Sequence, residues 1–248
     1  MSPERARTPD WRDAEAYAPL LEVDRSGFAW EWLRRDGGYR EAVVGGDAGR
    51  WGLHAFEAPD WDAIAARPVW RREAYPYVLE AAAEDEGRDE DRLDLERLRR
   101  LLTLVRSIGG IEHLLLSDGR RGIRIDIASG TVGAGPVRLS YRLAGLAGAQ
   151  APLLVLRQLL ALWRTGEFSR ALHPEEPRAA RWILVLRAGD ALAAGASQRE
   201  IAECLLGREA AQRRWRVETS SLRSRVQRLA REARRMAAGG YRELLAGG

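Results

Sequence analysis

The sequence predicts an α+β fold that is mainly α-helical. Three observations support this: tryptophan is dense in the first 75 residues, apolar residues alternate after residue 110, and helical patterns fill the C-terminal third. We expect a small Trp-rich N-terminal module (1–75), a charged linker and helix (76–109), and a C-terminal domain (110–248). Within that domain the patterns predict a short antiparallel β-meander followed by a helix-turn-helix-like bundle.

The N-terminal module contains six of the nine tryptophans. They are Trp11, Trp30, Trp32, Trp51, Trp61 and Trp70. Short helices are expected at 13–21 and 25–36, with Asp24 or Ser26 as a cap for the second. Aromatic packing explains the tryptophan density; a surface for stacking bases is the less favoured alternative because no basic run separates the rings.

The linker contains an almost continuous charged run at 84–92. Beyond it, Leu98, Leu101, Leu102 and Val105 recur at helical spacing, which predicts a helix over 90–107 that Gly109-Gly110 ends.

Residues 111–143 change to a period of two and predict three short strands. Ile123, Ile125 and Ile127 alternate with Arg124 and Asp126, and the same pattern covers 137–142. One buried face is expected, with the arginines pointing outward, where a solvated surface is favoured over a second phosphate contact. The glycine-rich run 130–135 lacks the lysine of a phosphate-binding loop and predicts a hairpin loop.

Helices are expected at 150–164, 178–194, 197–206 and 219–238. The third begins with Ser197 followed by Glu200, which is a capping box, and ends before Gly207. After the fourth, Tyr241, Leu244 and Leu245 are expected to fold back onto the bundle.

Helix 219–238 is strongly two-sided. Its apolar stripe comprises Leu222, Val226, Leu229, Ala233 and Met236, and its opposite side comprises Ser220, Ser224, Gln227, Arg228, Arg231 and Arg235, with Arg223 and Arg234 at the margin. Fixed positive charge beside short polar side chains suits phosphates and base edges. A merely solvated face is the alternative, and residues 207–218 are longer than the usual turn of this motif.

Charge is distributed unevenly along the chain. All 40 basic residues are arginine, and from Arg178 onward 15 Arg stand against 7 Asp and Glu. A basic C-terminal segment is typical of nucleic-acid binders, although it also suits an acidic protein partner. The N-terminus has no secretory pattern and the longest apolar run, 151–163, is too short for a bilayer, so a cytoplasmic protein is expected.

Catalytic and metal-binding patterns are absent from the sequence. His54, His113 and His173 have no Cys, Asp or Glu neighbour at ligand spacing, and Cys204 is a single core cysteine. We therefore expect no enzymatic activity, no metal and no cofactor.

Several stretches also resemble a known family. The run DALAAGASQREIAECLLG, the later TSSLRSRVQRL and the closing MAAGGYRELL resemble the RovC-like DNA-binding family of proteobacterial regulators, over about 110–245. The beginning, with DWRDAEAY and LLEVDRSGFAWEWLRRD, resembles the regulator-like module that precedes that domain. This resemblance implies sequence-specific DNA binding and control of transcription.

The residues and the resemblance together predict a transcription regulator that inserts helix 219–238 into the DNA major groove. Arg228, Arg231 and Arg235 would contact phosphates or guanine edges. Ser220, Ser224 and Gln227 would lie nearer the bases, and Arg223 and Arg234 would flank the groove. Double-stranded DNA, a homo-oligomer and RNA polymerase are the expected partners. The alternative is a protein-interaction module that docks its basic helix on an acidic partner of the transcription or replication machinery.

Overall fold

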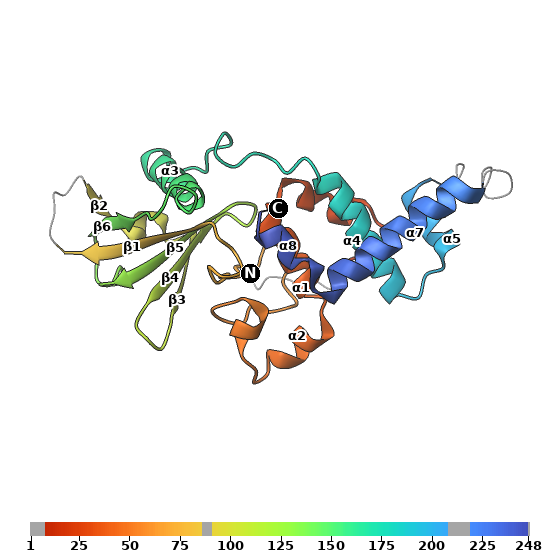
Figure 1. Cartoon of the computed structure of the whole chain (residues 1–248), viewed down its shortest axis with the longest axis horizontal. Coiled ribbons are helices and arrows are strands. Elements are labelled where there is room, and N and C mark those ends of the chain that lie inside the picture. The colour runs from red at the N-terminus through yellow and green to blue at the C-terminus, as the bar shows by residue number, and fades with distance from the viewer. Residues whose placement is uncertain (1–7, 86–90, 208–218, 248) are drawn as a thin grey trace.

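The computed structural model describes residues 8–85, 91–207 and 219–247, and of residues 219–222 it describes only the backbone. The fold is α+β, as predicted. A sheet covered by α3 occupies one end of the molecule, α5 and α7 occupy the other, and α1, α2 and α8 lie between them (Figure 1). The helices are α1 (Arg25–Leu33), α2 (Gly37–Ala42), α3 (Gln150–Thr165), α4 (Ala179–Ala193), α5 (Gln198–Leu205), α7 (Thr219–Arg235) and α8 (Arg242–Leu245).

The sheet has six strands in the order β2-β6-β1-β5-β4-β3. They are β1 (Val78–Glu84), β2 (Arg92–Leu93), β3 (Leu102–Arg106), β4 (Glu112–Ser117), β5 (Gly122–Ser129) and β6 (Val137–Arg142). β1 pairs parallel with β5, and the other pairs are antiparallel.

The predicted β-meander is wrong because β1 lies between β5 and β6. β1 reads VLEAAAE, so its alanines and glutamates give little strand signal, and partner strands on both sides hold it in the sheet. The run 130–135 therefore connects two strands that do not pair, and is not a hairpin loop. At its start Gly130 has φ 75°, and a Cβ there would lie 2.1 Å from the Ala83 carbonyl oxygen.

The predicted helix over 90–107 is also wrong. The chain forms β2, a 3-10 helix at Leu95–Leu98 that the Asp94 side chain caps, and then β3. Of the four apolar residues at helical spacing, only Leu98 lies in the 3-10 turn, whereas Leu102 and Val105 belong to β3. Antiparallel pairing with β4 then extends the chain over Leu102–Arg106.

One face of the sheet and α3 enclose a hydrophobic core. Side chains that alternate along β4 and β5, such as Leu114, Ile123 and Ile125, meet Val155 and Leu159 of α3. The predicted helix at 150–164 is confirmed as α3, which ends at Gly166 with φ 75°.

The N-terminal module forms a second core together with the C-terminal helices. Tyr17, Trp30 and Trp70 are fully buried in one cluster that also contains Leu186 of α4 and Leu229 of α7. Burial of these rings supports the aromatic-packing interpretation. The helix expected at 13–21 is a 3-10 helix at Glu15–Glu22, and α1 begins after Asp24, whose side chain accepts the Gly27 N–H as the predicted cap.

Buried ion pairs join the module to α4. Arg35, two residues after α1, binds Asp190 of α4 at 2.7 Å and also pairs with Glu31 of α1, while the Tyr17 hydroxyl donates to Asp190 at 2.7 Å. Because the carboxylate of Asp190 is nearly inaccessible, these bonds fix α4 firmly against α1.

The last residues fold back as expected. After α7 a π-helical turn at Met236–Gly240 kinks the chain at Gly239, at φ 103°, and leads into α8. Tyr241 and Leu245 are each 1% exposed in the second core, so the predicted fold-back is confirmed.

Candidate nucleic-acid interface

Helices α4, α5 and α7 pack together at one end of the molecule (Figure 1). The capping box of α5 is confirmed: the Ser197 hydroxyl accepts the Glu200 N–H, and the Glu200 carboxylate accepts the Ser197 N–H at 2.8 Å. Ile201 and Ala202 of α5 are buried against Val226 of α7. Residues 208–218 lie outside the described residues, so the predicted connection between the two helices is not described.

The apolar stripe of α7 is buried as predicted. Val226, Leu229, Ala233 and Met236 are at most 4% exposed, and Ala230 joins them. The side chain of Leu222 lies outside the described residues. This stripe packs against α4 and fixes which side of α7 faces the solvent.

Three of the predicted DNA-contacting residues line one shallow hollow. Gln227, Arg231 and Arg234 of α7 enclose it with Gln198 at the start of α5, and its volume is about 390 Å³. All three side chains of α7 are exposed. Guanidinium and amide groups thus share one concave surface formed by two helices.

The other predicted residues are spread around this hollow. Arg223 and Arg228 are exposed and Ser224 is half-buried, while the side chain of Ser220 lies outside the described residues. Arg235 turns toward α8, where it pairs with Glu243 at 2.6 Å. A phosphate would have to compete with that carboxylate, so Arg235 is the least available of the arginines predicted to contact DNA.

Sequence reasoning did not select Gln198. The signal was present, because Gln198 follows the capping serine directly and so occupies the first position of α5. Only the packing of α5 on α7 brings it beside Arg231.

The arginines of the sheet do not form a second basic surface. Arg138 pairs with Glu84, and Arg142 pairs with Glu80 at 3.1 Å. Arg124 was expected to point outward but is 2% exposed. The segment that contains Trp70 covers this face, and the Arg124 guanidinium donates to the Trp70 carbonyl at 3.0 and 3.1 Å.

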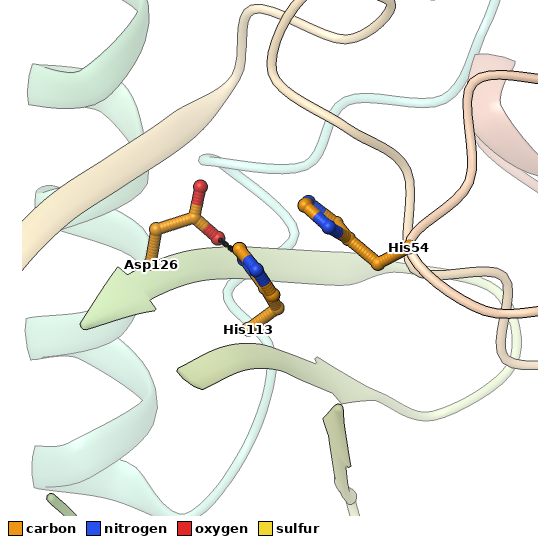
Figure 2. A group of neighbouring side chains, drawn as sticks. All are labelled: His54, His113 and Asp126. Carbon is orange, nitrogen blue, oxygen red and sulfur yellow. Dashed lines mark hydrogen bonds and ion pairs between the residues drawn. The ribbon is translucent and has the colours of Figure 1, made fainter. Parts of the chain in front are cut away.

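A pair of histidines, of which His54 is half-buried and His113 is buried, lies next to Arg124. The rings of His54 and His113 stack with centroids 3.4 Å apart, and His113 Nδ1 lies 2.7 Å from Asp126 Oδ1 (Figure 2). His54 comes from the N-terminal module, whereas His113 and Asp126 come from β4 and β5. No ligand spacing in the sequence indicated this cluster, because 72 residues separate His54 from Asp126 and 13 separate His113 from Asp126.

Burial and its neighbour His113 lower the pKa of His54 to about 4, so its ring is neutral at pH 7. Burial alone would raise the pKa of Asp126, but the hydrogen bond from His113 and the charge of Arg124 hold it below its usual value. The cluster therefore contains one carboxylate balanced by one guanidinium.

Within the described residues, His54, His113 and Asp126 place donor atoms within 4.8 Å of one another, which is close enough for a metal ion. Their arrangement fits a metal poorly. The stacked rings do not converge on one point, and Arg124 brings a positive charge to 2.9 Å from Asp126. The geometry suits a joint between the N-terminal module and the sheet.

Comparison with protein families finds a DNA-binding domain in the segment that contains α4, α5 and α7. Residues 144–246 match the family described as a T6SS transcription factor DNA-binding domain, RovC. The chain carries a RovC DNA-binding domain. Residues 10–92 match the proteobacterial transcriptional regulator-like domain, so the two domains follow in the expected order. Comparison with curated proteins gives no match.

The RovC match contains α3, α4, α5, α7 and α8, whereas β3–β6 lie between the two matched segments. Both families are those of transcription regulators, and the chain is a DNA-binding transcription regulator. Among the described residues, no helix combines the length and apolar character that crossing a bilayer requires.

Proposed function

We propose that this regulator binds specific DNA sequences through the exposed face of α7 and the first residue of α5. The observation that carries the proposal is the hollow in which Gln227, Arg231 and Arg234 meet Gln198. The buried opposite side of α7 orients these groups, so binding DNA would require little ordering of the helix itself.

Each group has a defined chemical role in this proposal. A guanidinium can bind a phosphate or two acceptors on a guanine edge, and a glutamine amide can bind adenine through its N6 and N7 positions. Arg231 and Arg234 would supply affinity, and Gln227 would supply discrimination between bases. Arg223, Arg228 and Ser224 would extend the contact, while Ser220 and Arg235 are weaker candidates within the predicted set.

A symmetric homo-oligomer would place two copies of α7 on the two halves of an operator. RNA polymerase is a further proposed partner, since a bound activator or repressor acts on it. The mixed arginine and glutamine surface favours DNA over an acidic protein, because the glutamine amide both donates and accepts, as base edges do, whereas carboxylates only accept.

Three single variants test the assignment by DNA titration at several salt concentrations. Arg231→Ala and Arg234→Ala should each weaken binding to all sequences and flatten the slope of log K against log salt by about one unit. Gln227→Ala should mainly reduce the ratio of specific to non-specific affinity.

Arg142→Ala is the matched control, because Arg142 is a 76% exposed arginine on the sheet, at the other end of the molecule. It should leave the slope unchanged. If the α7 variants behave like this control, the DNA contact lies elsewhere. Binding to an acidic protein without binding to DNA would favour the docking module.

A further inference from the structure

A cavity of about 370 Å³ lies where the N-terminal module, the sheet and the RovC domain meet. Its walls come from the start of α1, the segment before β1, the β4–β5 turn, α3, the α3–α4 connection, the end of α8 and Gly247. This volume is within the range of small-molecule pockets, roughly 300–1,000 Å³. The cavity shares no lining residue with the hollow between α5 and α7, so its role does not depend on where DNA binds.

Part of the wall is apolar and aromatic. The rings of Tyr75 and Tyr77 lie 5.5 Å apart at a tilted angle, and Leu154, Leu172 and Leu244 line the same space. Such walls favour a flat apolar body over a fully hydrated solute.

The charged groups at the wall are already paired. Arg25 binds Glu176 at 2.6 Å and Arg120 binds Glu22 at 2.7 Å. The Asp24 carboxylate accepts the Ser26 hydroxyl and the Gly27 N–H. Arg170 and Glu175 are exposed and keep their hydration. Arg121 pairs with Asp118 at 3.5 Å. The enclosed part of the described wall therefore offers no unpaired cation for an anion to bind.

Among the described residues of the wall, one fully enclosed side-chain polar atom has neither a hydrogen-bond partner nor an ion-pair partner: Nε2 of His173. Nδ1 of this ring lies 3.0 Å from the Ser169 carbonyl oxygen, and because a carbonyl only accepts, Nδ1 carries the proton. Nε2 is then a buried lone pair without a donor. The amide of Gln158 binds the Leu172 carbonyl at 2.8 Å and holds this part of the connection in place.

We propose that this cavity is a binding site for a small neutral aromatic molecule that donates one hydrogen bond, from a hydroxyl or ring N–H, to His173 Nε2. The tyrosine and leucine walls would hold its rings. Because both matched domains contribute walls, a bound molecule would stabilise their junction.

Two probes that differ by one O-methyl group, which removes the donor, test this chemistry: 2-naphthol and 2-methoxynaphthalene, titrated calorimetrically into the full chain. The naphthol should bind at least about tenfold more tightly, because its methyl ether leaves Nε2 unpaired. In His173→Phe, whose ring fills the same space without an acceptor, the two probes should bind equally. The anion 2-naphthoate should bind more weakly than the naphthol, because Arg25, Arg120 and Arg121 are already paired and Arg170 stays hydrated.

A second pair of variants tests the location. Leu154→Trp on α3 fills the cavity and should abolish binding of 2-naphthol, whereas Leu160→Trp, at a 47% exposed position of the same helix, should not change it. Equal binding of both probes to the unmodified chain would overturn the proposal. Binding of 2-naphthol to the Leu154→Trp variant would also overturn it. Absence of binding of any probe to the unmodified chain would overturn it too, and would mean that only water fills the cavity.

Discussion

Replacing Arg124 by methionine tests whether the buried joint between the N-terminal module and the sheet stabilises the fold. The guanidinium donates to Trp70 O at 3.0 and 3.1 Å, to Leu114 O at 2.6 Å and to Asp126 Oδ1 at 2.9 Å. Methionine fills much of the same volume but leaves the Asp126 carboxylate without its buried cation.

Breaking a buried ion pair by removing one partner costs about 3–5 kcal/mol, because the remaining charge stays buried. The lost bonds to carbonyl groups act in the same direction, so the upper half of this range is expected. With a urea m-value of roughly 2–3 kcal/mol/M, the midpoint of unfolding should fall by roughly 1.3–2.5 M.

Urea unfolding followed by tryptophan fluorescence measures this change, since several tryptophans are buried in the affected core. Arg142→Met is the matched control: this exposed arginine pairs with Glu80 at the surface, and its loss should cost about 0–1 kcal/mol. Equal midpoints for the two variants would refute the conclusion that the Arg124 network joins the module to the sheet.

Three further predictions concern single residues. The folded-state pKa of His54, about 4, lies below its unfolded value of about 6.5, so its stabilising effect is complete above pH 6.5 and is lost as pH falls toward 4. The shift corresponds to at most about 3 kcal/mol of unfolding free energy, and the partial exposure of His54 reduces this to about 1–2 kcal/mol. His54→Phe should therefore flatten the fall in stability between about pH 6.5 and about pH 4. Equal pH profiles for the variant and the unmodified chain would contradict the shift. Gly130→Ala should lower stability by about 2 kcal/mol or more, because φ is 75° and the new Cβ would meet the Ala83 carbonyl; a neutral result in thermal unfolding would show that the loop can move. Ser197→Ala should cost about 1 kcal/mol by removing the cap of α5, and Ser197→Asp should restore most of it; no loss in the alanine variant would mean that the capping box adds nothing.

The sequence predicted the elements whose signals are local. The capping box at Ser197, the cap at Asp24 and the two-sided pattern of α7 each depend on residues within a few turns, and the structure shows all three. The apolar stripe of α7 also predicted which side faces the solvent, so the exposure of Arg231 and Arg234 followed.

Features that depend on distant residues were not predicted. β1 becomes a strand because β5 and β6 hold it, not because of its own alanine-rich sequence. Arg124 looked like an outward residue on an alternating strand, yet Trp70, 54 residues earlier, covers it. The stacking of His54 on His113 likewise has no local signal.

The central claim is that this chain binds specific DNA through arginine contacts on α7. Titration of the full chain with its own upstream DNA and with scrambled DNA, from about 50 to about 300 mM salt, tests it most directly. Specific binding should exceed non-specific binding by about 10³-fold or more and should weaken steeply with salt. Absence of binding to either DNA at the lowest salt would contradict the claim and would direct attention to an acidic protein partner.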